Sequence, residues 1–514
     1  MPGVDHSGKN QLLTAARGSL RVLVLGASGA GMSAAIDILN DLQHTVVGFD
    51  DAFLAPADSH CQTSAGGQPP RRLTAERFRP GITFLNNTPD VDTAASFDLC
   101  IASPAFGQQH PALQSVVAAQ VPVFSLPQFV AEVFRHKKQI CVAGTHGKST
   151  TAAMLAWILE QCEQPVSYFV GAQRQGPDGR SGRWSSSGWA VIESCEYAKS
   201  FLNYRPDIAV LTGIERDHFD CFADTDAEDH AYQGFVNLCP TTGTLIGWQH
   251  DERSNRIFRS ARAQTCVQLP AVDQQPTPSD VATRNAEPRP QPSDWTISDV
   301  RDTRTGVRAM IRMRSREGRI HVPLPGRHNL QNAMLAIAAA YAAGVDLQSA
   351  CDAVSQFPGL RRRFEHRGSY RGLSLVDDYA HHPSAIRHTL QATAATFPGQ
   401  RIVAVMEPHQ LCRLRSLFDG FVEALIPADE ILVLPVFAAR EDATLLECCR
   451  VSGDLVRSIN QRGGRAFLFA NLDQIVARID HSARPNDVLL TLGAGRTNLI
   501  HDEFHRRLQR HSVA

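Results

Sequence analysis

The sequence predicts an α/β protein made of three domains. Its 514 residues exceed a single ordinary core, because domains commonly contain about 150 residues. Apolar, strand-like runs alternate with amphipathic helical runs along most of the chain, which is typical of sheets with parallel strands. Two of these strands lead through a glycine turn into a helix. We place the domain boundaries near residues 138 and 357, which gives domains at 1–138, 139–357 and 358–514.

The first domain is predicted from a strand, a glycine turn and a helix near its start. Residues 21–26 and 45–50 are predicted strands, and residues 30–42 are a predicted amphipathic helix between them. The turn G-A-S-G-A-G resembles the nucleotide-binding pattern G-x-G-x-x-G, with a serine in place of the second glycine. Because tight turns also use glycine for packing, the turn by itself leaves both interpretations open. The candidate binding residues here are Gly26, Ser28, Gly29, Gly31 and Met32.

The central domain opens with a second strand, glycine loop and helix, formed by residues 140–143, the sequence G-T-H-G-K-S and residues 152–161. Such a loop aims backbone N–H groups and a helix N-terminus at one point, where phosphates can bind. The alternative is an ordinary helix start with an exposed lysine, since the pattern G-x-x-x-x-G-K-[ST] is incomplete here. We interpret the loop as an ATP site in which Lys148 meets the terminal phosphates and Ser149 holds Mg²⁺. The candidate cofactor-binding residues are Gly144, Thr145, His146, Gly147, Lys148, Ser149 and Thr150.

Carboxylates and an imidazole follow two further strands of this domain, which are predicted at residues 189–192 and 208–212. The first strand leads into E-S-C-E from Glu193, and the second leads into G-I-E-R-D-H, which ends at His218. Oxygen ligands suit Mg²⁺, and a neutral imidazole can hold a metal ion or its water. We expect Ser149, Glu193 and His218 to form the metal site, with helix caps or exposed loop residues as the alternative.

Three polar segments are predicted to be loops rather than helices or strands. Residues 1–18 predict a flexible tail, and residues 61–80 are rich in turn-forming residues. Residues 269–294 are dense in Pro, Gln, Ser and Asp, so they cannot bury enough apolar surface to offset their ordering entropy. We expect this last segment to be a flexible insertion in the central domain, followed by an amphipathic helix at residues 329–343.

The third domain again alternates strands and helices, with strands predicted at 373–376, 402–406, 430–434 and 488–492. Ligands of open α/β sheets lie off the carboxyl ends of the strands. Four polar residues come just past these strands and are placed to face a ligand: Asp377, Asp378, Glu407 and His409. The adjacent histidines at 381 and 382 point in different directions, which favours substrate recognition over a shared metal ion. The arginines at 361–363, 413 and 415 fit either solvated faces or forks for carboxylate and phosphate.

The charge balance and the spacing of the cysteines limit the kinds of partner and the cellular location that the protein can have. Lys and Arg number 51 against 52 Asp and Glu, which leaves no net field to attract nucleic acid or an anionic membrane. The 12 cysteines are scattered without C-x-x-C spacing, which suits reduced thiols rather than disulfides or a zinc site. No apolar run reaches the length of a signal peptide or a membrane span. We expect a cytoplasmic protein with small-molecule partners, without nucleic acid and without membrane insertion.

Six motifs together resemble those of the Mur ligases, in the same order and at similar spacing. They cover residues 20–495 approximately, and six linked motifs are far more specific than one glycine loop. The motifs are G-T-H-G-K-S-T-T from Gly144, G-I-E-R-D-H-F-D from Gly213, P-G-R-H-N-L-Q-N-A from Pro325, G-L-R-R-R-F from Gly359, D-D-Y-A-H-H-P from Asp377 and E-P-H from Glu407. The resemblance implies an N-terminal Rossmann-like UDP-sugar domain, a central P-loop ATPase domain and a C-terminal Rossmann-like α/β domain that closes over the amino acid.

The resemblance also implies a reaction, the ligation of L-alanine to UDP-N-acetylmuramate with ATP and Mg²⁺. This is the first stem-peptide step of peptidoglycan synthesis. The muramate carboxylate attacks the γ-phosphate of ATP, and the alanine amine then attacks the resulting acyl phosphate. Because a carboxylate must approach a polyanion, Mg²⁺ and Lys148 would screen the transferred phosphoryl group.

Carried over motif by motif, the resemblance assigns roles to residues of all three domains. Asn329 and Asn332, one helical turn apart, would contact the adenine side of ATP. Arg363 and Asp378 would enter from the third domain to complete the nucleotide and acyl-phosphate site. The implied catalytic residues are Lys148, Glu193, His218, Arg363 and Asp378. The implied substrate-binding residues of the third domain are Tyr379, His381, His382, His409 and Arg413.

Departures from the family pattern leave the amino acid open. Gln410 stands where alanine-adding members commonly have an arginine, while Cys195 and Ala198 replace acidic residues. No lysine follows Lys199, so the carbamylated lysine that other Mur ligases carry after the D-H-F-D-like motif is impossible, which favours the alanine-adding branch. The alternatives are a recycling ligase that adds a tripeptide to the same sugar nucleotide, an NAD-dependent oxidoreductase and a non-catalytic ATP-driven binding module.

Overall fold

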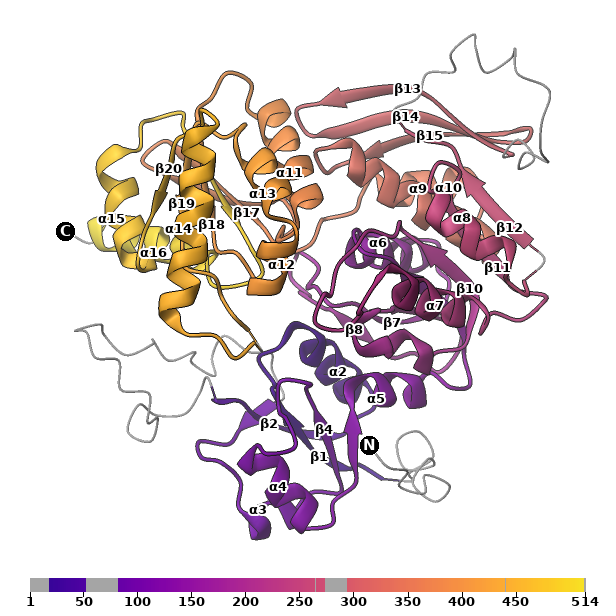
Figure 1. Cartoon of the computed structure of the whole chain (residues 1–514). Coiled ribbons are helices and arrows are strands. Elements are labelled where there is room, and N and C mark those ends of the chain that lie inside the picture. Colours follow the sequence, from indigo (N-terminus) through magenta and orange to yellow (C-terminus); the bar gives the residue numbers. More distant parts are fainter. Residues whose placement is uncertain (1–17, 52–81, 264, 273–293, 440, 513–514) are drawn as a thin grey trace.

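The computed structural model describes residues 18–51, 82–263, 265–272, 294–439 and 441–512. Within these ranges the chain forms three α/β units in sequence order, each built on its own mainly parallel sheet (Figure 1). The predicted α/β class with three domains is thereby confirmed. The predicted loop at 61–80 and nearly all of the predicted tail and insertion lie outside the described residues. Among the described helices, none combines the length and the apolar character needed to cross a membrane.

The first unit is a five-stranded parallel sheet in the order β3-β2-β1-β4-β5. Apolar residues of β1 face two different clusters on the two sides of the sheet, because helices cover both faces. The predicted strand, turn and helix at its start are confirmed. The elements are β1 (Arg21–Leu25), α2 (Ala30–Asp41), β2 (Thr45–Phe49), β3 (Ile82–Phe84), α3 (Val91–Ala95), β4 (Leu99–Ala102), α4 (Pro111–Ala118), β5 (Val123–Ser125) and α5 (Leu126–Val133).

The second unit is a seven-stranded sheet in the order β12-β11-β10-β6-β9-β7-β8, in which only the β7–β8 pair is antiparallel. The glycine loop predicted to bind phosphate follows β6 at the middle of this sheet. The elements are β6 (Lys138–Ala143), α6 (Lys148–Gln161), β7 (Val166–Phe169), β8 (Gly182–Arg183), β9 (Trp189–Glu193), the 3₁₀ helix η3 (Tyr197–Asn203), β10 (Pro206–Leu211), α7 (Thr225–Val236), β11 (Thr244–Trp248), α8 (Glu252–Arg259) and β12 (Thr265–Leu269).

A three-stranded antiparallel sheet follows in the same unit, and the sequence analysis did not predict it. It consists of β13 (Trp295–Thr303), β14 (Gly306–Met313) and β15 (Arg316–Val322). Buried residues of β14 and β15 alternate with exposed ones and join the same apolar cluster as the next helix, α9 (Arg327–Ala342). The unit ends with α10 (Leu347–Val354).

The third unit is a six-stranded sheet in the order β16-β17-β21-β18-β19-β20, parallel except at the edge strand β16. The strands predicted near 373, 402, 430 and 488 are confirmed as β17, β18, β19 and β21. The elements are β16 (Glu365–Tyr370), β17 (Leu373–Asp378), α11 (Pro383–Thr396), β18 (Ile402–Met406), α12 (Leu411–Ser416), α13 (Phe418–Leu425), β19 (Glu430–Val433), α14 (Leu445–Gln461), β20 (Ala466–Leu468), α15 (Leu472–Ser482), β21 (Val488–Leu492) and α16 (Leu499–Ser512).

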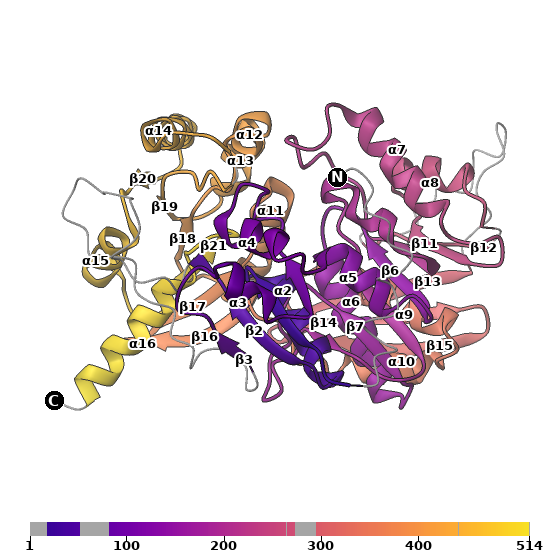
Figure 2. The ribbon, with the colours of Figure 1, turned by 90° about the horizontal axis from the view of Figure 1, so that it is seen from below.

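The first two units are joined by a shared apolar core, whereas the third is not. One cluster of buried residues runs from β1 and α2 into β6 and α7. The Asp37 carboxylate of α2 also accepts hydrogen bonds from the N–H groups of Ser181 and Gly182 at 2.9 and 2.8 Å. The two buried clusters of the third unit contain only residues from 364 onward, and this unit lies to one side of the central one in both Figure 1 and Figure 2. We therefore expect the third unit to move against the other two.

Because two histidines of the third unit are buried, we expect acid to destabilise the protein. Burial lowers the pKa of His382 to about 4 and that of His501 to about 3, with His146 and Arg367 adding to the respective shifts. A lowered folded-state pKa gives stability that is present above the unfolded pKa, near 6.5, and is lost as the pH falls through the folded values. Asp377 opposes this, because burial raises the pKa of its carboxyl to about 6 despite the pull of Arg362.

From these three groups the free energy of unfolding should therefore fall by about 2–3 kcal/mol between about pH 7.5 and about pH 5, since each histidine loses about 2 and Asp377 returns between 1 and 2. The buried His381, whose pKa is lowered as well, adds to the fall. Urea unfolding at the two pH values measures this change. His501→Gln should reduce the loss, because Gln does not titrate. Equal stability at both pH values would contradict the assignment of neutral, buried imidazoles.

Candidate active site

The glycine loop between β6 and α6 is closely confined on both sides. Gly147 has φ +80°, and a Cβ at this position would lie 2.2 Å from Asn332 Oδ1 on α9. Gly144 has φ +128°, and a Cβ there would lie 2.3 Å from Thr212 Oγ1, just past β10. Only glycine meets both demands at these positions. The loop consequently turns sharply and directs the N-terminus of α6 into the space between the domains, where it can receive an anion.

The predicted phosphate lysine is held by a carboxylate that the sequence analysis did not select. Lys148 Nζ lies 2.9 Å from Glu196 Oε2 and 3.2 Å from the carbonyl oxygen of Thr145. Burial works to lower the pKa of Lys148, but Glu196 and Cys195 outweigh it, so the pKa is raised and the ammonium is charged. Glu196 is 1% exposed. Glu196 therefore holds the Lys148 ammonium beside the glycine loop.

The three predicted metal ligands fall into two adjacent groups. Ser149 Oγ donates to Glu193 Oε1 at 2.8 Å, and His218 Nε2 lies 3.3 Å from Glu196 Oε1. Cys195, Glu196 and His218 each offer one ligand atom, and these atoms lie within 4.8 Å of one another. A hydroxyl, two carboxylates and an imidazole beside a phosphate loop fit Mg²⁺, which prefers oxygen ligands and keeps several waters.

Two predicted residues of the third domain reach this loop in different ways. Arg363 Nη2 donates to Ser149 Oγ at 3.3 Å across the domain boundary. Asp378 instead accepts from two backbone N–H groups of its own domain, Phe364 at 2.7 Å and Ala380 at 2.8 Å. Asp378 also lines the cavity, but its carboxylate is engaged in holding the turn that carries Arg363.

Asp378→Asn is therefore expected to lower kcat by about tenfold to a hundredfold with the fold retained. An amide can accept at only one of its two ends, so one buried backbone N–H loses its acceptor, which costs about 1–3 kcal/mol. Steady-state rates and circular dichroism of the variant measure the two effects separately. Unchanged kinetics would remove Asp378 from the site.

A histidine pair and a carboxylate connect the phosphate loop with the start of α11. His146 Nε2 lies 3.1 Å from His382 Nδ1, and Glu215 Oε2 lies 3.6 and 3.7 Å from these same atoms. Ser384 Oγ donates to Glu215 Oε2 at 2.5 Å. Burial alone would raise the pKa of Glu215, but His146 and Ser384 outweigh it and lower the pKa to about 2. The group thus brings together residues predicted for cofactor and for substrate. His381 faces other partners, as expected for adjacent residues.

The predicted cation of the amino-acid pocket is engaged by a carboxylate of the central domain. Arg413 is 2% exposed, and its Nε donates to Asp217 Oδ1 at 2.8 Å. Its Nη1 lies 3.3 Å from His409 Nδ1. Burial works to raise the pKa of Asp217, but Arg413, His218 and His381 hold it well below its usual range. In this arrangement Arg413 joins the two domains.

One cavity of about 1320 Å³ lies between the three domains and collects most of the predicted site. Asp217, Cys195, Glu215 and His328, which the sequence analysis did not select, also line it. The predicted residues that line it are Ser28, Thr145, His146, Gly147, Lys148, Ser149, Thr150, Glu193, His218, Asn329, Asn332, Arg363, Asp378, Tyr379, His381 and His382. Those outside its lining are Gly26, Gly29, Gly31, Met32, Gly144, His409 and Arg413.

The glycine turn of the first domain serves packing more than the sequence pattern indicated. A Cβ on Gly26 would lie 2.6 Å from Ser103 Cβ, and one on Gly31 would lie 2.9 Å from Leu126 Cδ2. Met32 is 2% exposed and belongs to the apolar core. Ser28 reaches the cavity, while its N–H and Oγ both donate to Asp50 Oδ2, at 3.0 and 2.6 Å. Asp50 directly follows β2, where dinucleotide-binding domains carry the acidic residue that binds the ribose of NAD, and here its carboxylate is engaged by Ser28.

Two long segments of the chain match known domain families, and nearly the whole chain matches curated proteins. Residues 142–340 match the family described as Mur ligase middle domain, and residues 362–495 match Mur ligase, glutamate ligase domain. The chain is 31% identical over 482 residues to UDP-N-acetylmuramate--L-alanine ligase of Desulfitobacterium hafniense, which covers 93% of this chain and 97% of that protein. It is also 31% identical over 488 residues to the protein of the same name from a Roseiflexus species, with 92% and 96% covered.

Solved structures with the same overall fold come from two kinds of ligase. UDP-N-acetylmuramate-alanine ligase MurC from Thermotoga maritima has a TM-score of 0.72 at 21% identity, covering 96% of this chain and 99% of that one. A murein peptide ligase from Psychrobacter arcticus has a TM-score of 0.66 at 22% identity, covering 95% and 98%. At these identities the likeness concerns the fold.

Proposed function

Because this chain belongs to the Mur ligase family, we propose that it joins L-alanine to UDP-N-acetylmuramate while ATP is cleaved to ADP and phosphate. The proposal is supported most by one observation. One cavity is lined by all three domains, and its lining includes the glycine loop, Lys148, the predicted metal ligands and Arg363 of the third domain. Such a cavity can hold a nucleotide and two further reactants at once.

In the first step an oxygen of the muramate carboxylate attacks the γ-phosphorus of ATP. A new P–O bond forms while the bond from the γ-phosphorus to the bridging oxygen breaks, and ADP leaves. Lys148 transfers its ammonium from Glu196 to the phosphates, and Arg363 supplies a second cation from the opposite side. Ser149, Glu193 and His218 would hold Mg²⁺, which would supply further positive charge beside the phosphates.

In the second step the alanine amine attacks the carbonyl carbon of the acyl phosphate. A C–N bond forms, the C–O bond to phosphate breaks, and the proton that the nitrogen loses passes to the departing phosphate. His381 and His382 line the cavity and are neutral, because burial lowers both pKa values, so they add no charge that would repel the incoming ammonium. They can orient the amine through hydrogen bonds.

Closure of the third domain is part of this proposal. Its contacts with the central domain are polar, such as Arg363 with Ser149 and Arg413 with Asp217, and it shares no apolar cluster of described residues with the first two domains. Polar contacts can be exchanged for water more readily than an apolar core can be opened. Closure then brings the reactants together and excludes water from the acyl phosphate.

Product mass tests the proposal directly. The purified protein is given ATP, Mg²⁺ and UDP-N-acetylmuramate together with single amino acids or the stem tripeptide. We expect a product one alanyl residue heavier than the sugar nucleotide, and ADP release that requires both other substrates and stops when the metal is chelated. Ligation of the tripeptide alone would favour the recycling ligase, and intact ATP in every mixture would contradict the proposal.

A further inference from the structure

Three consecutive arginines mark the crossing from the central to the C-terminal domain. The N–H of Arg361 donates to the carbonyl oxygen of Gln173, in the central domain, at 2.8 Å. Arg362 is fixed to the C-terminal domain, because its N–H donates to Glu365 Oε2 at 2.9 Å and its carbonyl accepts from the N–H of Tyr379 at 2.7 Å. The chain thus changes domain between these two arginines.

The turn just after this crossing presents Arg363 from a strained backbone. Arg362 and Phe364, on either side of it, have φ of +59° and +47°, in the left-handed region that side-chain-bearing residues rarely adopt. Such conformations persist only where the surroundings hold them. Asp378 holds the far side through the N–H of Phe364. The near side depends on Arg362.

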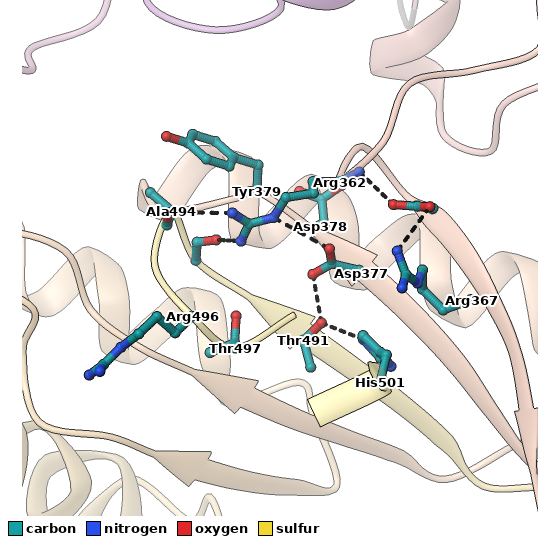
Figure 3. A network of polar contacts seen from close by, with 12 residues as sticks. Arg362, Arg367, Asp377, Asp378, Tyr379, Thr491, Ala494, Arg496, Thr497 and His501 are labelled. Atoms are coloured by element: carbon teal, nitrogen blue, oxygen red, sulfur yellow. Dashed lines mark hydrogen bonds and ion pairs between the residues drawn. The ribbon is translucent and has the colours of Figure 1, made fainter. Parts of the chain in front are cut away.

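Arg362 is anchored by its side chain to the end of the C-terminal sheet (Figure 3). Its Nη2 donates to the carbonyl oxygen of Gly493 at 2.7 Å, and its Nε lies 3.4 Å from Asp377 Oδ2. The guanidinium also lies over the Tyr379 ring, 5.1 Å from its centroid. Arg362 therefore points back into its own domain, whereas Arg363 points out to Ser149.

Asp377 is itself fixed from the other side and is fully buried. Thr491 Oγ1, on the neighbouring strand β21, donates to Asp377 Oδ1 at 2.7 Å, and His501 Nε2 of α16 lies 2.7 Å from the same hydroxyl (Figure 3). A neutral amide could accept from Thr491 equally well. A buried charge at this position is costly unless it is paired, and the guanidinium of Arg362 pairs with it.

We propose that Asp377 is a positioning residue, which acts through Arg362 to hold the turn that delivers Arg363 to the phosphate loop. This inference rests on the proposed ligase function. Three carboxylates of β16 and β17 then fix the turn together. Glu365 and Asp378 accept from backbone N–H groups of the turn, while Asp377 pairs with the side chain of Arg362. Asp377 touches no substrate in this scheme.

The first test compares Asp377→Asn with a matched control. Glu430→Gln removes a charge from another buried carboxylate of the same sheet, which accepts from Arg478 at 2.9 Å, at the start of β19. We expect Asp377→Asn to lower kcat about tenfold, while KM for UDP-N-acetylmuramate and the melting temperature change little. The control should change stability and leave kcat unaltered. Thr491→Val, which removes the hydroxyl held by Asp377, should lower kcat in the same direction and serves if the first variant does not fold.

The pH dependence provides a readout that a purely structural role would not change. Besides Arg362, the charged groups facing Asp377 are Asp378 and Glu365, and His501 lies beyond Thr491. Burial raises the pKa of Asp377 to about 6, so the carboxyl becomes neutral below that value. The ratio of wild-type kcat to that of Asp377→Asn should therefore fall toward one below pH 6. Taking this ratio cancels the titration of groups that both proteins share.

A double variant decides whether the effect passes through Arg363. If it does, Asp377→Asn added to Arg363→Ala should cause no further loss of kcat. Fully additive losses, a kcat ratio independent of pH, or a wild-type kcat in Asp377→Asn would each overturn the inference while wild-type ligation continues. Absence of ligation by the wild type would overturn the proposed function instead, so the two failures are distinguishable.

Discussion

Lys148→Ala is expected to reduce ATP-dependent ligation by about 10³-fold, the loss typical of removing a preorganised charge from a developing anion. The ammonium is buried beside the phosphate loop and is the only lysine side chain among the residues that line the described cavity. A carboxylate must attack a triphosphate, so without this cation the two anions repel each other at short range. UDP-N-acetylmuramate should still bind. ADP release and binding of the sugar nucleotide, measured on the same preparation, separate the two.

Two control variants separate the loss of the Lys148 charge at the loop from a general loss of positive charge and from a loss of stability. Lys138→Ala makes the same change at the exposed opposite end of β6 and should retain the wild-type rate. Removing Lys148 also leaves Glu196 buried with only the His218 imidazole as a partner, and breaking a buried ion pair can destabilise a protein by about 3–5 kcal/mol. The double variant Lys148→Ala/Glu196→Gln should regain stability and stay inactive. Normal turnover in either variant would refute the role of the loop.

Local patterns explain why much of the fold could be predicted. β6 and the helix after its glycine loop are contiguous in sequence, and each is a largely apolar run, which a short window reveals. The same holds for β17 and the strands of the C-terminal sheet. The antiparallel sheet of β13 to β15 was missed although buried and exposed residues alternate in β14 and β15, because its exposed positions are charged or polar and its strands lack the continuous apolar runs of buried parallel strands.

Residues of the site could be predicted from the sequence only where they belong to a recognisable motif. Lys148, Glu193 and Asp378 stand in recognisable patterns, but their partners come from distant parts of the chain. The pairing of Lys148 with Glu196 spans 48 positions, and nothing local in the sequence specifies it. Met32 shows the opposite error. It was predicted to bind substrate because it follows the glycine turn, but its side chain is buried in the core. Tertiary packing, which has no sequence period, decides both.

Arg413→Ala is expected to lower ligation by about 10²-fold to 10³-fold, because it breaks a buried ion pair between domains. Asp217 would stay buried and unpaired in the closed arrangement, and breaking such a pair costs about 3–5 kcal/mol. The third domain shares no apolar cluster with the rest of the described chain, so polar contacts such as this pair join it to the central domain. Arg415→Ala, two residues along on α12, breaks only an exposed pair with Glu447 and should change the rate little.

A second measurement separates closure from recognition of alanine. If Arg413 acts by closing the domains, the variant should keep a larger radius of gyration in solution with ATP and UDP-N-acetylmuramate bound, and a high concentration of alanine should not restore the rate. If Arg413 instead binds the alanine carboxylate, KM for alanine rises and the radius of gyration falls as in the wild type. Replacing both partners, as Arg413→Met/Asp217→Leu, removes the unpaired charge, so it should restore closure in the first case but leave KM for alanine raised in the second. Wild-type kinetics in Arg413→Ala would exclude both roles, since a buried guanidinium that bridges two domains cannot be lost without effect if those domains must meet.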